Sequence, residues 1–238
     1  MSTTLVDREI VYPDSDGKPM ADNTKQFDWI VTIEGGLEAL FADRPDVFVA
    51  GDLLWYPVEG DNKTRAAPDA MVAFGRPKGH RGSYKQWCEQ GIAPQVVFEV
   101  LSPGNTSREM DAKRAFYDRY GVEEYYLYDP DRGLLQGWLR SGGRLRAIEE
   151  MRGWVSPRLG VRFDLDGLDL CLYRPDGKRF ISNLEAQQRA DQEKQRADQA
   201  EQRADQAEQA LRQQMQVQLA AIRQLRQLGL SRNKSQRR

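Results

Sequence analysis

Apolar and polar positions along most of the chain follow patterns that predict one mixed α/β domain. Between residues 26 and 41, apolar side chains recur near the helical period, which predicts a helix. The pair Gly35-Gly36 weakens this helix, because each glycine costs up to about 1 kcal/mol relative to alanine. Predicted strands follow at residues 47–56, 70–74 and 95–101. The last of these is apolar almost throughout, as in a strand that is covered on both faces.

A second helix is predicted directly after the third strand. Thr106 or Ser107 can cap its start, and Glu109 completes a capping-box pattern with Thr106. The helical pattern reaches Tyr120 and stops at Gly121, a residue typical of helix ends. Residues 122–128 then form another predicted strand. The order strand, helix, strand predicts a crossover or a mixed sheet flanked by helices.

Shorter strands are predicted beyond Pro130, separated by glycine-containing turns as in antiparallel hairpins. They cover residues 134–139, 145–150, 161–164 and 168–173. Together these elements predict a domain over residues 26–181 with a β-rich finish. An N-terminal segment, residues 1–25, leads into this domain and is expected to be mobile.

A seven-residue repeat distinguishes residues 182–228 from the rest of the chain. Three copies beginning with Arg-Ala-Asp place alanines at heptad spacing, which predicts a coiled-coil helix. Alanine buries little area, so this seam alone would associate weakly. The steps of four residues from Ala207 to Leu211 and on to Met215 form a stutter. A solitary, solvated helix is the alternative, and the polar, basic residues 229–238 are expected to be disordered.

The chain of 238 residues has a low mean hydropathy of −0.72, because its last quarter contains few large apolar side chains. Residues 182–238 carry 11 basic and 7 acidic residues, whereas residues 1–181 carry 24 basic and 29 acidic ones. The domain therefore lacks a general polyanion-binding charge, and a nucleic-acid surface must be a local patch. No run of 18 apolar residues is present, so no membrane span is expected.

The cysteines and the histidine narrow the possible chemistry. Cys88 and Cys171 are the only cysteines, and the N-terminus shows no signal-peptide pattern, so free thiols in a cytoplasmic protein are expected. His80 is the only histidine. This excludes two-histidine zinc sites within one chain and disfavours a serine–histidine hydrolase.

Two acidic residues, Asp69 and Glu99, lie in or beside apolar strands, where a carboxylate is costly unless it is compensated. They are either members of structural ion pairs, such as Glu99 with Lys113 or Arg114, or metal ligands. Mg²⁺ and Mn²⁺ accept one or two carboxylates together with waters and phosphate oxygens. Lys113, on the second predicted helix, could stabilise the negative charge that develops in phosphoryl chemistry. Glu34, on the first helix, is expected to be solvated.

Three motifs in this region together carry a resemblance to a known family. The combined pattern resembles the Uma-two-type family of restriction endonucleases, within the PD-(D/E)XK nuclease superfamily, over about residues 12–173. The motifs are Pro68-Asp69, then Phe98-Glu99-Val100-Leu101-Ser102-Pro103, and then Asp111-x-Lys113-x-x-x-Tyr117-x-x-x-Gly121-Val122-Glu123-Glu124-Tyr125-Tyr126-Leu127-x-Asp129-Pro130.

The resemblance implies a restriction-endonuclease-like fold, with a mixed central sheet flanked by helices and a magnesium-dependent site. It implies that Asp69 is the aspartate of the motif and Glu99 its following acid. Leu101 occupies the place of the usual lysine. Lys113, on the next helix, is the matching lysine in this family.

The expected function is therefore an endonuclease that hydrolyses DNA with Mg²⁺ or Mn²⁺, held by Asp69 and Glu99, and with Lys113 assisting the attacking water. The basic, glycine-containing segment 76–85 is either a lid or recognition loop, or a solvated surface loop. Basic side chains position a nuclease on a duplex. The candidates for phosphate contacts are Arg65, Arg76, Lys78, Arg81, Lys85, Arg108 and Arg114.

The alternative is a catalytically inactive nuclease-fold module that binds nucleic acid or assembles through its coiled coil. The coil could also join two active copies into a homodimer, so that two sites address two strands, or bind another helical partner.

Overall fold

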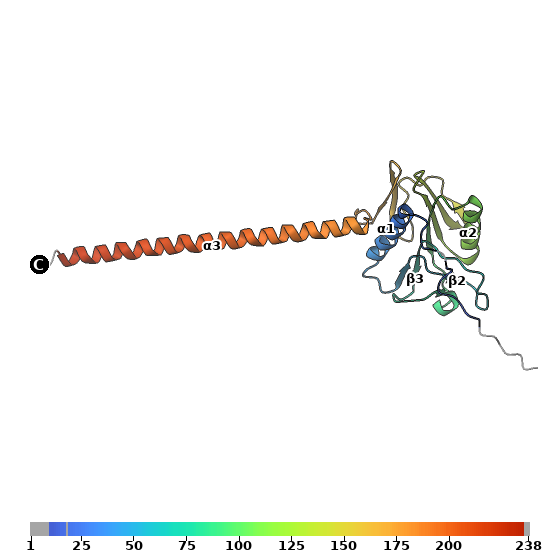
Figure 1. Ribbon diagram of the computed structural model, residues 1–238, viewed down its shortest axis with the longest axis horizontal. Helices are drawn as coiled ribbons and strands as arrows, with labels where there is room; N and C mark the ends of the chain where they lie inside the picture. The colour runs from blue at the N-terminus through green and yellow to red at the C-terminus, as the bar shows by residue number, and fades with distance from the viewer. Residues whose placement is uncertain (1–9, 18, 236–238) are drawn as a thin grey trace, which may run out of the picture. The chain divides into compact units, whose positions relative to one another are not determined.

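A computed structural model describes residues 10–17 and 19–235, except for the side chains of residues 183 and 225–235. The chain divides into two compact units, Met1–Asn183 and Leu184–Arg238. The first unit holds all of the strands and two α-helices, and the second is a single helix (Figure 1). The sequence places the end of the domain at residue 181, and the structure divides after Asn183.

A six-stranded mixed sheet forms the centre of the first unit, in the order β1-β3-β5-β6-β7-β8. The only parallel pair in this sheet is β5 with β6, and the other neighbours are antiparallel. The strands are β1 Val47–Ala50, β3 Ala70–Phe74, β5 Val96–Val100, β6 Glu124–Asp129, β7 Leu134–Ser141 and β8 Arg144–Ala147. The mixed sheet flanked by helices confirms the predicted fold class.

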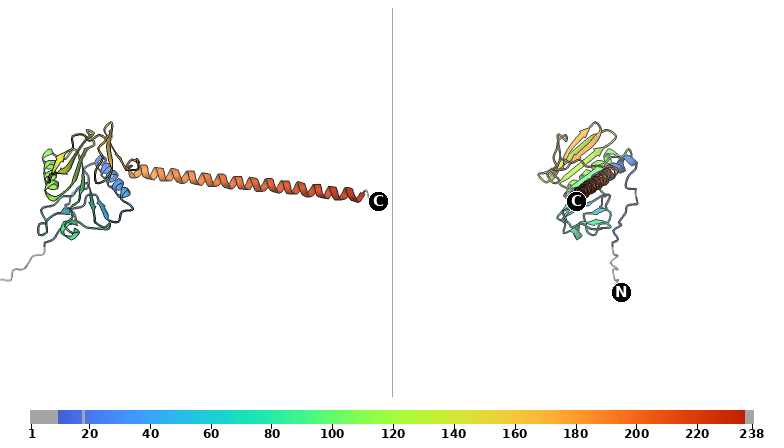
Figure 2. Two further views of the ribbon diagram at one scale, coloured as in Figure 1. Left: turned by 180° about the vertical axis from the view of Figure 1, so that it is seen from behind. Right: turned by 90° about the vertical axis from the view of Figure 1, so that its left-hand side faces the viewer.

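Helices α1 (Thr24–Leu40) and α2 (Ser107–Tyr120) cover opposite faces of this sheet (Figures 1 and 2). Successive residues of a strand point to opposite faces, so each strand contributes to both layers. The layer under α1 contains Ile30, Ile33, Leu37, Val49, Val72 and Phe98. The layer under α2 contains Met110, Tyr117, Met71, Val97, Tyr125 and Leu127. Each strand of the centre is therefore buried on both sides.

The crossover from β5 through α2 to β6 matches the prediction closely. The side chain of Thr106 accepts a hydrogen bond from the backbone N–H of Glu109 and caps the start of α2. Gly121 ends the helix in the left-handed region, with φ of 97°, which glycine adopts without steric cost. These local signals set the register of α2 over the sheet.

Two small sheets complete the unit. The hairpin β9 (Arg162–Asp166) and β10 (Asp169–Tyr173) contributes to the layer under α1, and the parallel pair β2 (Trp55–Tyr56) and β4 (Tyr84–Lys85) precedes a 3-10 helix, η1 (Gln86–Glu89). The single strand predicted over residues 47–56 is wrong. It is split into β1 and β2, because Asp52 has a φ of 48° and cannot continue a strand.

The described part of the N-terminal segment is packed against the domain, although the sequence favoured a mobile segment. The ring of Tyr12 lies 5.2 Å from that of Tyr56 and 5.0 Å from that of Trp87. The hydroxyl of Tyr56 donates a hydrogen bond of 2.7 Å to the carbonyl of Pro13. Asp14 accepts a hydrogen bond from Ser83. These contacts are long-range in sequence, so no local pattern could reveal them.

The second unit is helix α3, Asn183–Ser235, which runs without interruption for 53 residues. It includes the heptad segment, and it extends into the stretch 229–238 that was expected to be disordered. That expectation is wrong up to Ser235: Gly229 alone costs about 1 kcal/mol in a helix, and the residues around it do not break one. Residues 236–238 lie outside the described part of the chain. No described helix combines the length and the apolar character needed to cross a membrane.

Candidate active site

Asp69 lies directly before β3, and its carboxylate is held by the neighbouring strand. Its Oδ2 accepts a hydrogen bond of 2.6 Å from the backbone N–H of Val100. Ala70 pairs with Phe98 in the antiparallel ladder, so Asp69 stands beside Glu99 at the point where this ladder ends. The Asp69 side chain is 8% exposed. The two predicted acids are thus brought together at one edge of the β3–β5 pair.

Glu99 lies inside β5 and points towards α2, and it is only 2% exposed. Its Oε2 lies 2.7 Å from the ammonium of Lys113. Its Oε1 accepts a short hydrogen bond from the hydroxyl of Tyr117. Lys113 and Tyr117 are one helical turn apart and therefore lie on the same face of α2. The buried carboxylate is compensated on both oxygens by this one helix.

Of the two ion pairs considered for Glu99, the structure contains the one with Lys113. Arg114 instead pairs with Asp111 on its own helix, at 3.0 Å. The Glu99–Lys113 pair is compatible with both a structural and a catalytic role, because a lysine beside a carboxylate can serve either. What distinguishes this pair is Asp69, which adds a second buried carboxylate next to it.

The electrostatics show an excess of negative charge at this point. Burial raises the pKa of the Asp69 carboxyl well above its usual range, the charge of Glu99 raises it further, and Lys113 opposes both. Burial lowers the pKa of Lys113, but the charges of Glu99 and Asp69 more than offset this, so its pKa is raised overall. Burial and the charge of Glu99 raise the pKa of Tyr117 well above its usual range.

Asp52 is a further acidic residue of this site that was not singled out from the sequence. Its backbone N–H donates a hydrogen bond of 3.0 Å to the carbonyl of Pro68, which ties it to the residue before Asp69. Burial raises the pKa of Asp52, as do Asp16 and Glu99, whereas Lys113 lowers it. The signal was present, since Asp52 interrupts an apolar run just as Glu99 does.

Tyr117 was also missed as a site residue, although the motif contains it. The spacing of four residues from Lys113 places both side chains on one helix face, which was the available signal. Glu34 differs from its expected solvation, because it is half-buried and its Cγ lies close to Gly51. Burial, and then the charge of Glu38, raise the pKa of Glu34.

The donor set at Asp69 and Glu99 fits a hard divalent cation. Magnesium uses carboxylate oxygens, keeps several waters, and is held by one or two carboxylates together with substrate phosphates. Among the described residues, Oδ1 of Asp69 has no hydrogen-bond partner, and two carboxylates face a single ammonium. No group of three or more His, Cys, Asp or Glu side chains that could hold a metal occurs in the described part. Two protein ligands are therefore all that this site offers.

Two of the basic residues named as phosphate contacts are engaged elsewhere. Arg76 is only 8% exposed, and its Nε lies 3.1 Å from Oε2 of Glu89. Arg81 lies 2.6 Å from Oε1 of the same carboxylate and also covers the ring of Phe48. Both arginines are largely buried and share the one carboxylate of Glu89, so the structure gives each a partner within the protein, and their contact with phosphate stays a prediction. Segment 76–85 is pinned to the domain by these pairs.

The other basic candidates lie in several places. Lys78 pairs with Glu38 at 2.7 Å, and Lys85 lies 5.3 Å from the ring centre of Tyr12. Arg65 donates to the hydroxyl of Tyr56. Arg108 is exposed in the first turn of α2, the helix that carries Lys113. Arg108 is therefore an exposed candidate on the same helix as Lys113.

The chain matches the Uma2 family, described as "Putative restriction endonuclease", over residues 19–170, a stretch that contains Asp69, Glu99 and Lys113. A crystal structure of a putative nuclease belonging to DUF820 from Anabaena variabilis is similar, with 17% sequence identity and a TM-score of 0.44. The similarity covers 59% of this chain and 74% of that one. No curated protein matches the chain.

Proposed function

We propose, from the premise that this chain belongs to the Uma2 family of restriction endonucleases, that it hydrolyses phosphodiester bonds of DNA in a magnesium-dependent reaction. The observation that carries this proposal is the pair of buried carboxylates, Asp69 and Glu99, at the end of the β3–β5 ladder. A family of nucleases makes nucleic acid the substrate class to test first. The domain carries a net negative charge, so a nucleic acid would contact it through a local surface of basic side chains.

In this proposal, Asp69 and Glu99 would hold Mg²⁺, and Mn²⁺ could take its place. The ion would supply neutralisation of the scissile phosphate and a more acidic water for the attack. Asp69 presents its Oδ1, while its Oδ2 stays on the N–H of Val100. The carboxylate is thereby fixed by a backbone contact and does not depend on a mobile side-chain partner.

Lys113 has two roles in the proposed reaction. Its ammonium lies on Oε2 of Glu99 and compensates the buried charge of the site. The same ammonium can stabilise the negative charge that develops when water attacks the phosphate, as preorganised cations do. Tyr117 holds the other oxygen of Glu99 and so orients the carboxylate towards Asp69 and the substrate. Tyr117 is a positioning residue in this scheme.

The test is turnover of supercoiled plasmid by the full chain, with Mg²⁺ and with chelator. Cutting with Mg²⁺ that disappears in chelator and in Asp69→Asn and Glu99→Gln supports the proposal. Asp28→Asn is the matched control, because Asp28 is exposed on α1 and should cut like the unaltered chain. Failure to cut varied DNA and RNA substrates, with no metal bound, would favour the inactive nucleic-acid-binding module instead.

We also propose that α3 associates two copies of the chain as a coiled coil, or binds another helical partner. The support is a stripe of exposed apolar side chains beyond the alanine seam, which a solitary helix leaves in water. These are Leu211, Met215, Leu219 and Ile222. A pair of nuclease units would allow each to address one strand of a duplex. We also propose that the protein acts in the cytoplasm, because thiols such as Cys88 and Cys171 stay reduced there.

A further inference from the structure

A cavity of about 600 Å³ lies between α2 and the strands β6 and β7. We call it the α2–β7 pocket. Its volume falls in the range of small-molecule sites, roughly 300 to 1,000 Å³. The side chains that matter for its chemistry are Arg114 from α2, Tyr125 from β6, Arg132 from the turn, and Gln136 and Trp138 from β7. None of these five holds the proposed metal ion or assists the attacking water.

The α2–β7 pocket shares a sheet face with the candidate active site. Leu127, which lines the pocket, is the register partner of Glu99 in the parallel β5–β6 pair. The ring of Tyr125 lies 5.2 Å from that of Tyr117, which binds Glu99, and 4.9 Å from that of Trp138. A single aromatic side chain therefore separates the partner of Glu99 from the wall of the pocket.

Tyr125, which lines this pocket, has an unpartnered hydroxyl. The residue is fully buried, yet its hydroxyl has no hydrogen-bond partner among the described residues. The buried tyrosines Tyr117, Tyr126 and Tyr128 all donate, to Glu99, Glu124 and the carbonyl of Leu168. A buried polar group without a partner is costly, and it is an expected feature of a site that a ligand completes.

The charges of the pocket disfavour a bare phosphate. Arg114 pairs with Asp111 at 3.0 Å, and Arg132 lies 3.8 Å from Asp129. The two cations are therefore matched by carboxylates. Gln136 adds an amide donor and an amide acceptor. Such a lining suits a neutral, planar group with hydrogen-bonding edges, and Trp138 and Tyr125 give it an aromatic wall.

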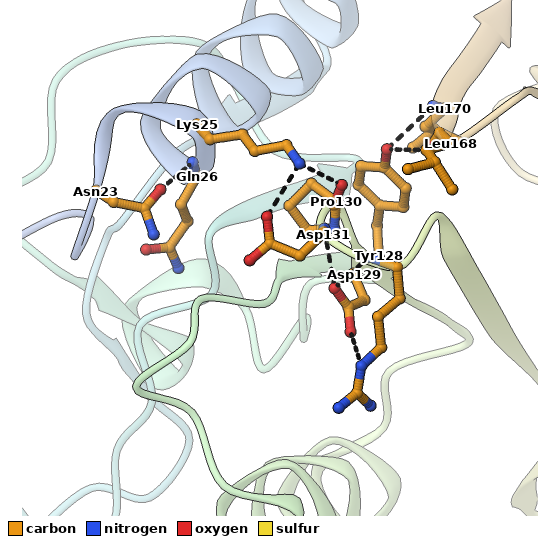
Figure 3. A network of polar contacts seen from close by, with 10 residues as sticks. Asn23, Lys25, Gln26, Tyr128, Asp129, Pro130, Asp131, Leu168 and Leu170 are labelled. Carbon is orange, nitrogen blue, oxygen red and sulfur yellow. Dashed lines mark hydrogen bonds and ion pairs between the residues drawn. The ribbon is translucent and has the colours of Figure 1, made fainter.

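The rim of the pocket is fixed in place before any ligand arrives. Figure 3 shows Lys25 of α1 reaching the turn after β6, where its ammonium donates to the carbonyl of Pro130 at 2.5 Å and to Asp131 at 3.0 Å. In the same turn, Oδ1 of Asp129 accepts the backbone N–H groups of Asp131 and Arg132. A preformed pocket loses little entropy on binding.

We propose that the α2–β7 pocket binds one unstacked nucleobase of the nucleic-acid substrate. The inference rests on the proposed function for its substrate class. The hydroxyl of Tyr125 and the amide of Gln136 would meet the edge of the base, and the aromatic wall would contact its ring. Enzymes that take a base out of the stack bind it by such hydrogen bonds and aromatic contacts, at a cost of a few kcal/mol for unstacking.

The experiment is photo-crosslinking of the full chain to oligonucleotides that carry one 5-iodouracil, with Ca²⁺ in place of Mg²⁺ to keep the strand uncut. Mass spectrometry then locates the cross-linked peptide. A cross-link at Tyr125 or Trp138 supports the proposal, and a cross-link confined to other segments overturns it. Free thymidine monophosphate is the second arm. If free thymidine monophosphate prevents cross-linking at the same concentration as an unlabelled oligonucleotide, the pocket binds free nucleotides. The proposal that it binds a base of the nucleic-acid substrate is then overturned.

Two variants sharpen the result. Tyr125→Phe removes the unpartnered hydroxyl, so it should weaken oligonucleotide binding about fivefold while leaving the protein at least as stable. Gln136→Trp fills the pocket from the exposed side of β7 and should abolish the cross-link. Tyr126→Phe is the matched control, because its hydroxyl already has a partner on the other face of the sheet. Unchanged binding in both pocket variants overturns the proposal.

This inference and the proposed function fail in different ways. Plasmid cutting together with cross-links outside the pocket removes the base site and leaves the nuclease standing. A cross-link at Tyr125 or Trp138 without any cutting removes the nuclease and leaves a nucleic-acid-binding pocket. Separate variants test the two proposals: Asp69→Asn should stop cutting, and Gln136→Trp should abolish the cross-link.

Discussion

The carboxylate of Asp69 accepts a hydrogen bond of 2.6 Å from the backbone N–H of Val100. This contact continues the β3–β5 pairing by one step with a side chain in place of a backbone carbonyl. It places the carboxylate of Asp69 beside that of Glu99 through the backbone of both strands. Two carboxylates are thereby held together in a buried position, where a negative charge on both is costly for folding and useful for holding a cation.

Asp69→Asn should remove cutting and make the protein more stable. The amide oxygen can still accept the N–H of Val100, while the buried negative charge beside Glu99 is gone. We expect the free energy of unfolding to rise by about 1 kcal/mol, because replacing a functional residue that destabilises the fold commonly increases stability. Urea unfolding in chelator measures this change.

Magnesium provides the complementary measurement on the same pair of proteins. A ligand that binds only the folded state raises the melting temperature, and the increase grows with the logarithm of ligand concentration divided by Kd. The unaltered chain should melt at a higher temperature with Mg²⁺ than with chelator, and Asp69→Asn should not respond. An equal response in both would show that the ion binds elsewhere.

Lys113→Met should destabilise the fold, because it leaves the buried carboxylate of Glu99 without its ammonium. Removing one partner of a buried pair costs about 3 to 5 kcal/mol. The side chain of Lys113 is 25% exposed, so we expect a smaller loss, about 2 kcal/mol. Adding Glu99→Gln should restore most of it, and urea unfolding of the four proteins closes the double-mutant cycle. Strictly additive effects would contradict this coupling.

Tyr117→Phe should cost about 2 kcal/mol of stability, in the range for a hydrogen bond to a charged group. The ring remains, so its parallel contact with Trp55 is kept and the loss reports the hydroxyl alone. The matched control is Tyr128→Phe, which removes a hydroxyl bound to the backbone of Leu168 and Leu170. That neutral pair should cost about 1 kcal/mol. A smaller loss for Tyr117 than for Tyr128 would argue against a charged Glu99.

Local signals explain which parts of this molecule could be predicted. Helix α2 was bounded correctly because Thr106 and Gly121 act within one turn of its ends. Asp69 and Glu99 stood out because a carboxylate in an apolar strand needs a compensating partner wherever the strand goes. Lys113 could be identified because it lies on the helix that follows the Glu99 strand. The two acids and the lysine do meet in space, as the order of the motifs implied.

Contacts distant in sequence explain what was missed. Asp52, at the break between β1 and β2, donates its backbone N–H to Pro68, sixteen residues later in the chain. The sequence predicts an exposed Arg76, but in the structure Glu89 of η1 pairs with it in a largely buried position. The docking of Tyr12 on Trp87 joins two segments that no pattern of hydrophobicity connects. In each case the partner, and not the residue itself, decides the burial.

Glu89→Gln should loosen the segment that Arg76 and Arg81 pin to the domain. Both guanidinium groups would lose their shared, largely buried carboxylate, at a cost of about 3 kcal/mol. Cys88 directly precedes Glu89 and is exposed, so its reaction with a thiol reagent reports on this segment. The reaction rate under native conditions should rise in the variant. Glu38→Gln is the control, since its pair with Lys78 is more exposed and should cost under about 1 kcal/mol. Equal losses would contradict the assigned burial.

Truncation after Asn183 should convert a self-associating chain into a monomer. Helix α3 carries alanines in the first part of its heptad seam and the larger Leu211, Leu219 and Ile222 further on, all exposed in the single chain. Apolar side chains contribute most of the association energy of a coiled coil, so the second part should dominate. Leu211→Gln together with Leu219→Gln should therefore weaken association at least tenfold in sedimentation equilibrium. Replacing Ala197 and Ala204 by glutamine should weaken it less. A full-length chain that sediments as a monomer at every concentration would show that α3 serves another partner.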